Sequence, residues 1–109
     1  MKLELEIEEL NKMLIKMANL VVENLKIAFD IYYKYDEVKA DLINDDLVDL
    51  HERLIEESCL NIMLRERPYA KDLRIVSGVL KLVGDLERLG DHAEDIRYFA
   101  RKLMQLILP

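Results

Sequence analysis

The chain has 109 residues and a mass of 12.9 kDa, enough for one domain with its own core but not for two. It contains only 3 Gly and 2 Pro residues, too few turn formers for an all-β sandwich or barrel. Its 16 Lys and Arg residues against 22 Asp and Glu residues give a net charge of −6, which argues against nonspecific binding to nucleic acid or to an anionic membrane.

A cytoplasmic location is expected from the same composition. The start of the chain, MKLELEIEEL, is too acidic for a signal peptide, and the single Cys59 excludes an intrachain disulfide. No apolar run approaches the roughly 18 to 20 residues that span a bilayer. We therefore expect no direct membrane insertion, so that any membrane contact goes through a partner protein.

A long first helix is predicted over about residues 3–35. Apolar residues recur there in alternating steps of four and three, the spacing of one face of a helix, and only Asn24 interrupts them. The expected buried stripe consists of Leu3, Ile7, Leu10, Leu14, Met17, Val21, Asn24, Ala28, Ile31 and Tyr35.

A second helix is predicted over about residues 38–67. Asp36 is the expected cap or turn residue before it, and Pro68 ends it because proline lacks a backbone donor and disfavours helix in the preceding residue. The expected buried stripe consists of Ile43, Leu47, Leu50 and Leu54, widened by Val48, Ile55 and Ile62.

A third helix is predicted over about residues 72–108, with Asp72 at the positive end of the helix dipole. Gly84 and Gly90 lie inside it and each costs about 1 kcal/mol relative to Ala, so we expect a close helix approach at Gly90 at least. The expected buried stripe consists of Val76, Val79, Val83, Leu86, Gly90, Ala93, Ala100, Leu103 and Ile107.

Three long helices with short connections predict an all-α fold, an antiparallel three-helix bundle that forms a single domain over residues 1–109. No enzymatic motif accompanies this fold. The chain has two serines, no threonine and no Gly-rich phosphate loop, and neither serine lies in a nucleophile motif. We therefore predict that the protein is not an enzyme.

Two pairs of acidic residues have the spacing of one helix face: Asp45-x-x-x-Asp49 in the second helix and Glu87-x-x-x-Asp91 in the third. Like charges four residues apart destabilise an isolated helix by about 0.2 to 0.5 kcal/mol per pair. Two interpretations explain how they are tolerated. Either they form a solvated face offset by cations such as Arg88, or antiparallel packing of the two helices brings them together as a metal site.

Carboxylate oxygens are hard ligands that suit iron, manganese, magnesium or calcium and accept zinc. A ferritin-like di-iron site is not supported, because Val48 and Leu89 stand where its Glu-x-x-His motifs require Glu. Further residues continue the acidic rows or adjoin them. The candidate auxiliary ligands are Glu52, His92 and Asp95, with a structural role for His92 as the alternative.

Three segments resemble the PhoU family of phosphate-uptake regulators: NDDLVD at residues 44–49, PYAKDLR at 68–74 and DLERLGDHA at 85–93. The resemblance extends over about residues 38–98. It implies a fold of three-helix bundles and metal-binding motifs of Glu or Asp, three residues, then Asp. These motifs stand here as Asp45 with Asp49 and Glu87 with Asp91.

The resemblance also implies cofactors and partners. The cofactor expected from it is iron or zinc, in a multinuclear cluster. The expected function is regulation of phosphate uptake and phosphate-starvation signalling, through contacts with the ATP-binding subunit of a phosphate transporter and with a sensor histidine kinase. Family members usually carry two three-helix repeats, whereas this chain has one, so we expect an uncovered face and self-association. The alternative is a structural or coiled-coil interaction module without metal.

Overall fold

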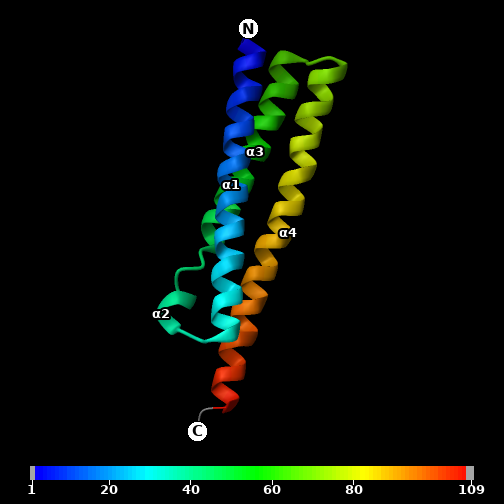
Figure 1. Ribbon diagram of the computed structural model, residues 1–109. Coiled ribbons are helices and arrows are strands. Elements are labelled where there is room, and N and C mark those ends of the chain that lie inside the picture. The colour runs from blue at the N-terminus through cyan, green and yellow to red at the C-terminus, as the bar shows by residue number, and fades with distance from the viewer. Residues whose placement is uncertain (1, 108–109) are drawn as a thin grey trace.

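The computed structural model describes residues 2–107 as four helices. They are α1 (Lys2–Tyr33), α2 (Glu37–Ala40), α3 (Asp45–Glu66) and α4 (Ala70–Ile107). In Figure 1, α1 and α4 run side by side in the same direction, and α3 runs antiparallel to both along the upper half of the molecule. The bundle measures 62 × 17 × 16 Å. The predicted all-α three-helix architecture is confirmed; the expected last residue of the third helix, 108, lies outside the described residues.

The predicted helix over residues 38–67 is wrong in one respect, because it is broken at residues 41–44 into α2 and α3. Asn44 has an extended backbone with φ −119° and ψ 90°, and its side chain accepts a hydrogen bond of 2.9 Å from the N–H of Leu47. This N-cap starts a new helix at Asp45. Asp36 caps α2 as expected, accepting from the N–H groups of Val38 and Lys39.

The core follows the predicted stripe of α1, in which Leu10, Met17, Val21, Ala28 and Ile31 are buried. The stripe predicted for the second helix is only partly right. Ile43, Val48, Ile55 and Ile62 are buried as expected, whereas the three predicted leucines are 37% to 45% exposed, because the side of α3 that faces the core is the one with Val48, Ile55 and Ile62. The exposed leucines are Leu47, Leu50 and Leu54, and the residues buried in α3 are Val48, Ile55, Cys59 and Ile62.

The buried stripe of α4 holds from Val76 to Ala100 but not beyond. Leu103 and Ile107 are 46% and 73% exposed, because the end of α4 extends past the end of α1 (Figure 1). No helix within residues 2–107 combines the length and the hydropathy needed to cross a bilayer.

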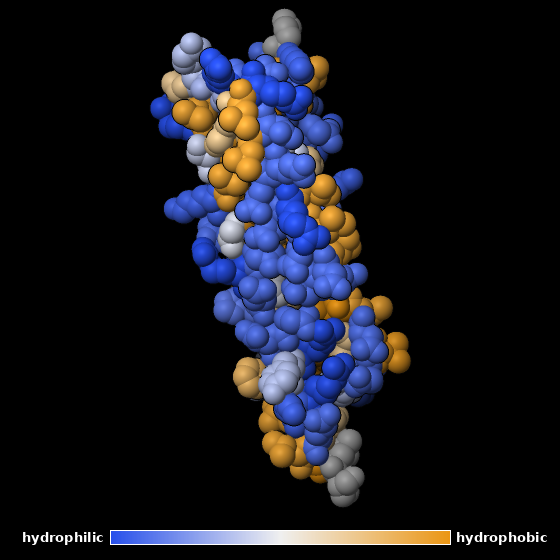
Figure 2. All heavy atoms as spheres, turned by 180° about the vertical axis from the view of Figure 1, so that it is seen from behind, coloured by the Kyte–Doolittle hydropathy of each residue, from blue (hydrophilic) through white to orange (hydrophobic). Residues whose placement is uncertain are grey.

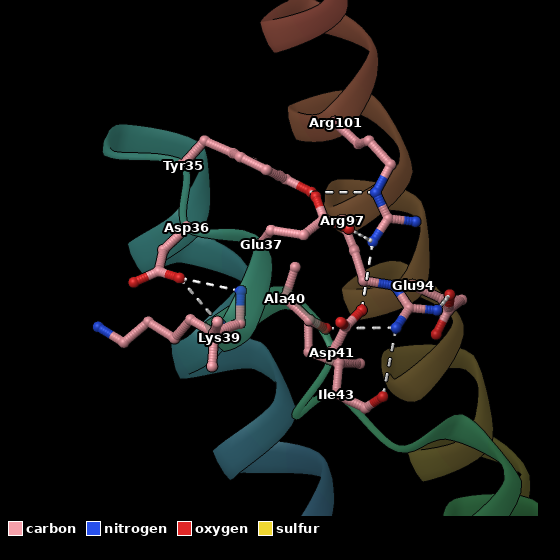
Figure 3. Close-up of polar contacts among 11 residues, drawn as sticks. Tyr35, Asp36, Glu37, Lys39, Ala40, Asp41, Ile43, Glu94, Arg97 and Arg101 are labelled. Carbon is pink, nitrogen blue, oxygen red and sulfur yellow. Dashed lines mark hydrogen bonds and ion pairs between the residues drawn. The ribbon is translucent and has the colours of Figure 1, made fainter.

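The strap between α1 and α3, residues 34–44, packs on the lower half of the bundle. Ala40 and Ile43 join a second apolar cluster, whose other buried members are Ala28 and Ile31 of α1 and Ala93 and Ala100 of α4. Arg101 of α4 fastens the outer side of the strap: its Nε donates to the Tyr35 hydroxyl at 3.0 Å, and its Nη2 pairs with Glu37 at 2.9 Å (Figure 3). The strap therefore takes the place of a third helix where α3 is absent.

Candidate metal centre

Antiparallel packing of α3 on α4 brings the predicted acidic residues together. Asp45, Glu87 and Asp91 each offer a carboxylate oxygen within 4.8 Å of the others, and so do Asp49, Glu52 and Glu87. Glu87 belongs to both groups. The four residues predicted as principal ligands thus form, with Glu52, one continuous acidic cluster between the two helices.

Helical geometry explains this arrangement. Asp45, Asp49 and Glu52 follow one another in steps of four and three, so they share the side of α3 that faces α4. Glu87 and Asp91 are one turn apart on α4 and lie opposite them. The spacing within each helix predicts which carboxylates share a side, and the packing of α3 on α4 brings the two sides together.

The cluster holds a proton at neutral pH. The pKa of Glu87 is raised to about 8, first by loss of solvent around its carboxyl, then by a hydrogen bond to Asp49, and further by the charges of Glu52 and Asp91. Burial also raises the pKa values of Asp45 and Glu52, and neighbouring carboxylates add to both shifts. A carboxyl group kept protonated at neutral pH indicates that the cluster has more negative charge than its surroundings stabilise.

Several carboxylate oxygens here have no hydrogen-bond partner. Asp45 Oδ1, Glu87 Oε2 and Glu94 Oε2 are buried from solvent and accept no hydrogen bond from the described residues. Within residues 2–107, no Lys, Arg or His forms an ion pair with any of the five clustered carboxylates. Arg88, expected to offset Asp91, pairs with Asp85 instead. Buried acceptors without donors carry a desolvation cost that a bound cation would remove.

The auxiliary candidates separate into two classes. Glu52 lies in the cluster, whereas His92 and Asp95 are exposed and belong to neither group of ligand atoms. Glu94 was missed in the sequence, although its charge contributes to the raised pKa of Asp45. Its position seven residues after Glu87 places it two turns along the same face of α4, and this spacing is the signal that would have identified it.

The fold and the cluster together define a class of protein: a three-helix bundle with a cluster of carboxylates between two of its helices. The chain belongs to the PhoU domain family, whose model matches residues 14–99.

Figure 2 shows the bundle from behind, where the middle of the surface is largely hydrophilic and hydrophobic side chains gather toward the edges and the lower end.

Relatives of known name support this membership. The chain is 43% identical over 98 residues to a phosphate-specific transport system accessory protein PhoU homolog of Aquifex aeolicus, an alignment that covers 88% of this chain and 44% of the relative. A protein of the same name from Clostridium acetobutylicum is 34% identical over 103 residues, which cover 92% of this chain and 47% of the relative. The chain therefore spans less than half the length of these relatives. No solved structure matches it.

Proposed function

We propose that this chain is a metal-binding regulatory domain of phosphate uptake. The observation that carries the proposal is the acidic cluster of α3 and α4, in which five carboxylates lie together with buried, unpartnered oxygens. Asp45, Asp49, Glu87 and Asp91 would be the principal ligands and Glu52 an additional one. When bound, the metal supplies positive charge that ties the two helices together; iron or zinc is the metal we favour, in a site of more than one ion.

The regulatory part of the proposal draws on family membership and on the relatives' names, which describe accessory proteins of a phosphate-specific transport system. We place this chain in the same kind of system. It would act in the cytoplasm through protein contacts with the transporter's ATP-binding subunit and with a sensor histidine kinase, without catalysing a reaction. A pull-down with each purified subunit, with and without metal, tests both contacts.

Self-association completes the proposal. On α1, Ile15, Val22 and Phe29 are exposed at seven-residue spacing, and on α4 Leu82 and Leu89 are exposed at the same spacing. Exposed apolar residues that recur at this spacing form stripes on which a second copy of the chain can pack. Sedimentation should show a dimer for the wild type and a monomer for Val22→Asp combined with Leu89→Asp. A wild type that stays monomeric would refute self-association.

Metal binding is tested by thermal unfolding of chelator-treated protein with and without added iron, zinc or manganese. Ligand binding to the folded state should raise the midpoint of the wild type and leave Asp49→Ala combined with Asp91→Ala unchanged. Glu23→Ala combined with Glu57→Ala removes two exposed carboxylates outside the cluster and should respond like the wild type. Equal responses of all three proteins, or none, would refute the metal site and favour a purely structural bundle.

A further inference from the structure

The linker before α3, residues 41–44, is held from two sides by polar side chains, the buried Asn24 of α1 and the half-buried Arg97 of α4. Asn24 of α1 is only 2% exposed, and both the nitrogen and the oxygen of its side-chain amide form hydrogen bonds with the backbone of Asn44. Its Nδ2 donates to the carbonyl oxygen of Asn44, and the N–H of Asn44 donates to its Oδ1, each at 3.4 Å. An Asn on an otherwise apolar stripe loses packing, so its polar contacts account for its place there.

From α4, Arg97 holds the same linker. Its Nη1 donates to the carbonyl oxygens of Ala40 and Ile43, both at 3.3 Å, and its Nη2 pairs with Glu94. Figure 3 shows the guanidinium between Glu94 and these two carbonyls. The Ala40 carbonyl also accepts a hydrogen bond of 3.3 Å from the N–H of Ile43, so Arg97 adds a second donor there and ties the end of α2 to the residue before the N-cap of α3.

The linker determines where α3 begins. Asn44 is the N-cap of α3, and Asp45, the residue that follows it, is the first residue of the helix and belongs to the group with Glu87 and Asp91. Terminal turns fray more readily than interior ones. Asp49 and Glu52 lie one and two turns inside α3, where helical hydrogen bonds fix the backbone. Of the clustered carboxylates on α3, Asp45 is thus the one whose place depends on the linker.

We propose that Asn24 and Arg97 are positioning residues that hold the Asp45 carboxylate beside Glu87 and Asp91 for metal binding. This inference rests on the metal site proposed above. Neither residue is a ligand. They act on the group that contains Asp45, whereas the group of Asp49, Glu52 and Glu87 is positioned without them.

The alternative is that Asn24 serves only the stability of the bundle. The two explanations differ in what Asn24→Leu should do. Leu has a similar size and completes the apolar stripe of α1, but it leaves the N–H and the carbonyl of Asn44 without their partner, so a purely structural role predicts a lower thermal midpoint of the metal-free variant and an unchanged affinity for metal. A positioning role requires that the same variant binds metal more weakly. Loss of groups that orient metal ligands costs about 10-fold to 100-fold in affinity.

The experiment titrates chelator-treated protein with Zn²⁺ in competition with a chromophoric chelator, which reports affinity and stoichiometry. Asn24→Leu and Arg97→Met should each lower the affinity of one class of site by about 10-fold to 100-fold and leave the other class unchanged. Arg97→Lys, which keeps a donor, should retain part of the affinity. Asn19→Leu, on the exposed side of α1, should bind like the wild type.

A double-mutant cycle gives the readout that general destabilisation would not produce. If Asn24 acts through Asp45, adding Asn24→Leu to Asp45→Asn should cause no further loss of affinity. A wild type that binds no Zn²⁺ overturns the proposed metal site and this inference with it. A wild type that binds Zn²⁺ while Asn24→Leu and Arg97→Met bind equally well overturns only the inference, and so does a full additional loss in the Asp45→Asn background. If Asn24→Leu fails to fold, Arg97→Met and its cycle with Asp45→Asn decide the question.

Discussion

Gly90 of α4 lies against Val48 of α3: a Cβ added at Gly90 would stand 3.2 Å from Val48 Cγ1. The close approach expected at this glycine is confirmed. Asp91 follows Gly90 and Asp49 follows Val48, so this contact also sets the separation of the two helices at the acidic cluster. A small residue at position 90 therefore serves both the packing of the bundle and the arrangement of the carboxylates.

A larger side chain at Gly90 is predicted to destabilise the fold. Gly90→Val should lower the free energy of unfolding by about 1 to 3 kcal/mol, because its added carbons overlap Val48 in a packed core. Gly84→Val is the matched control. A Cβ at Gly84 would meet nothing within 4 Å, so this variant should stay within about 0.5 kcal/mol of the wild type. Urea unfolding measures the free energy of unfolding of both variants. Equal effects at the two positions would contradict the close contact of Gly90 with Val48.

The main helices and the acidic cluster could be predicted from the sequence because both depend on helical periodicity. The steps of four place Asp45 with Asp49, and Glu87 with Asp91, on one side of their helices, and the packing of α3 on α4 brings the two sides together. The break at residues 41–44 was missed because an apolar period continues through it, whereas the decisive signal is the local capping by Asn44.

Contacts across the bundle were beyond the reach of periodicity. Asn24 was recognised only as an interruption of the apolar stripe, because its partner is the backbone of a residue twenty positions away. Arg97 was not singled out, since the carbonyls it binds belong to a linker whose path follows from packing. The spacing from Glu87 places Glu94 on the acidic face of α4, but its closeness to Asp45 depends on where α3 begins.

The stability of the metal-free protein is predicted to fall as the pH rises from about 5 to about 8. A free Glu has a pKa of about 4.3, and that of Glu87 is about 8 in the folded protein. Between these values the folded state binds more protons than the unfolded state, so raising the pH favours unfolding, and the effect is complete once the pH exceeds the folded pKa. Thermal midpoints measured across this pH range, in the presence of a chelator, test this dependence of stability on pH.

Glu87→Gln removes the group with the largest rise in pKa and should reduce this dependence, leaving a smaller slope from Asp45 and Glu52, whose pKa values are also raised. Glu57→Gln removes one exposed negative charge of α3 and should keep the wild-type slope, which separates the titration of Glu87 from a general effect of net charge. A slope in Glu87→Gln as steep as that of the wild type would contradict the assignment to this residue.

The thiol of Cys59 is predicted to be unreactive in the folded protein. Its side chain is fully buried among α1, α3 and α4, its Sγ lies 3.9 Å from the carbonyl oxygen of Val76, and burial raises its pKa to about 11. Because the thiolate is the reactive form, labelling with Ellman's reagent at mildly alkaline pH should be slow in buffer and immediate in concentrated guanidinium chloride. Rapid stoichiometric labelling of the native protein would contradict the burial of Cys59.

Metal binding is predicted to release a proton from the acidic cluster. Glu87 is mostly protonated at neutral pH, and its oxygens become ligands only when that proton leaves. Calorimetric titration with Zn²⁺ in neutral buffers of different ionisation enthalpy should therefore give a release approaching one proton for the ion that Glu87 binds. Near the folded pKa of about 8 the release should drop to about half, because half of the Glu87 carboxyls are already ionised. A release that does not change with pH would show that Zn²⁺ binds without displacing this proton, and Glu87 would then not be a ligand.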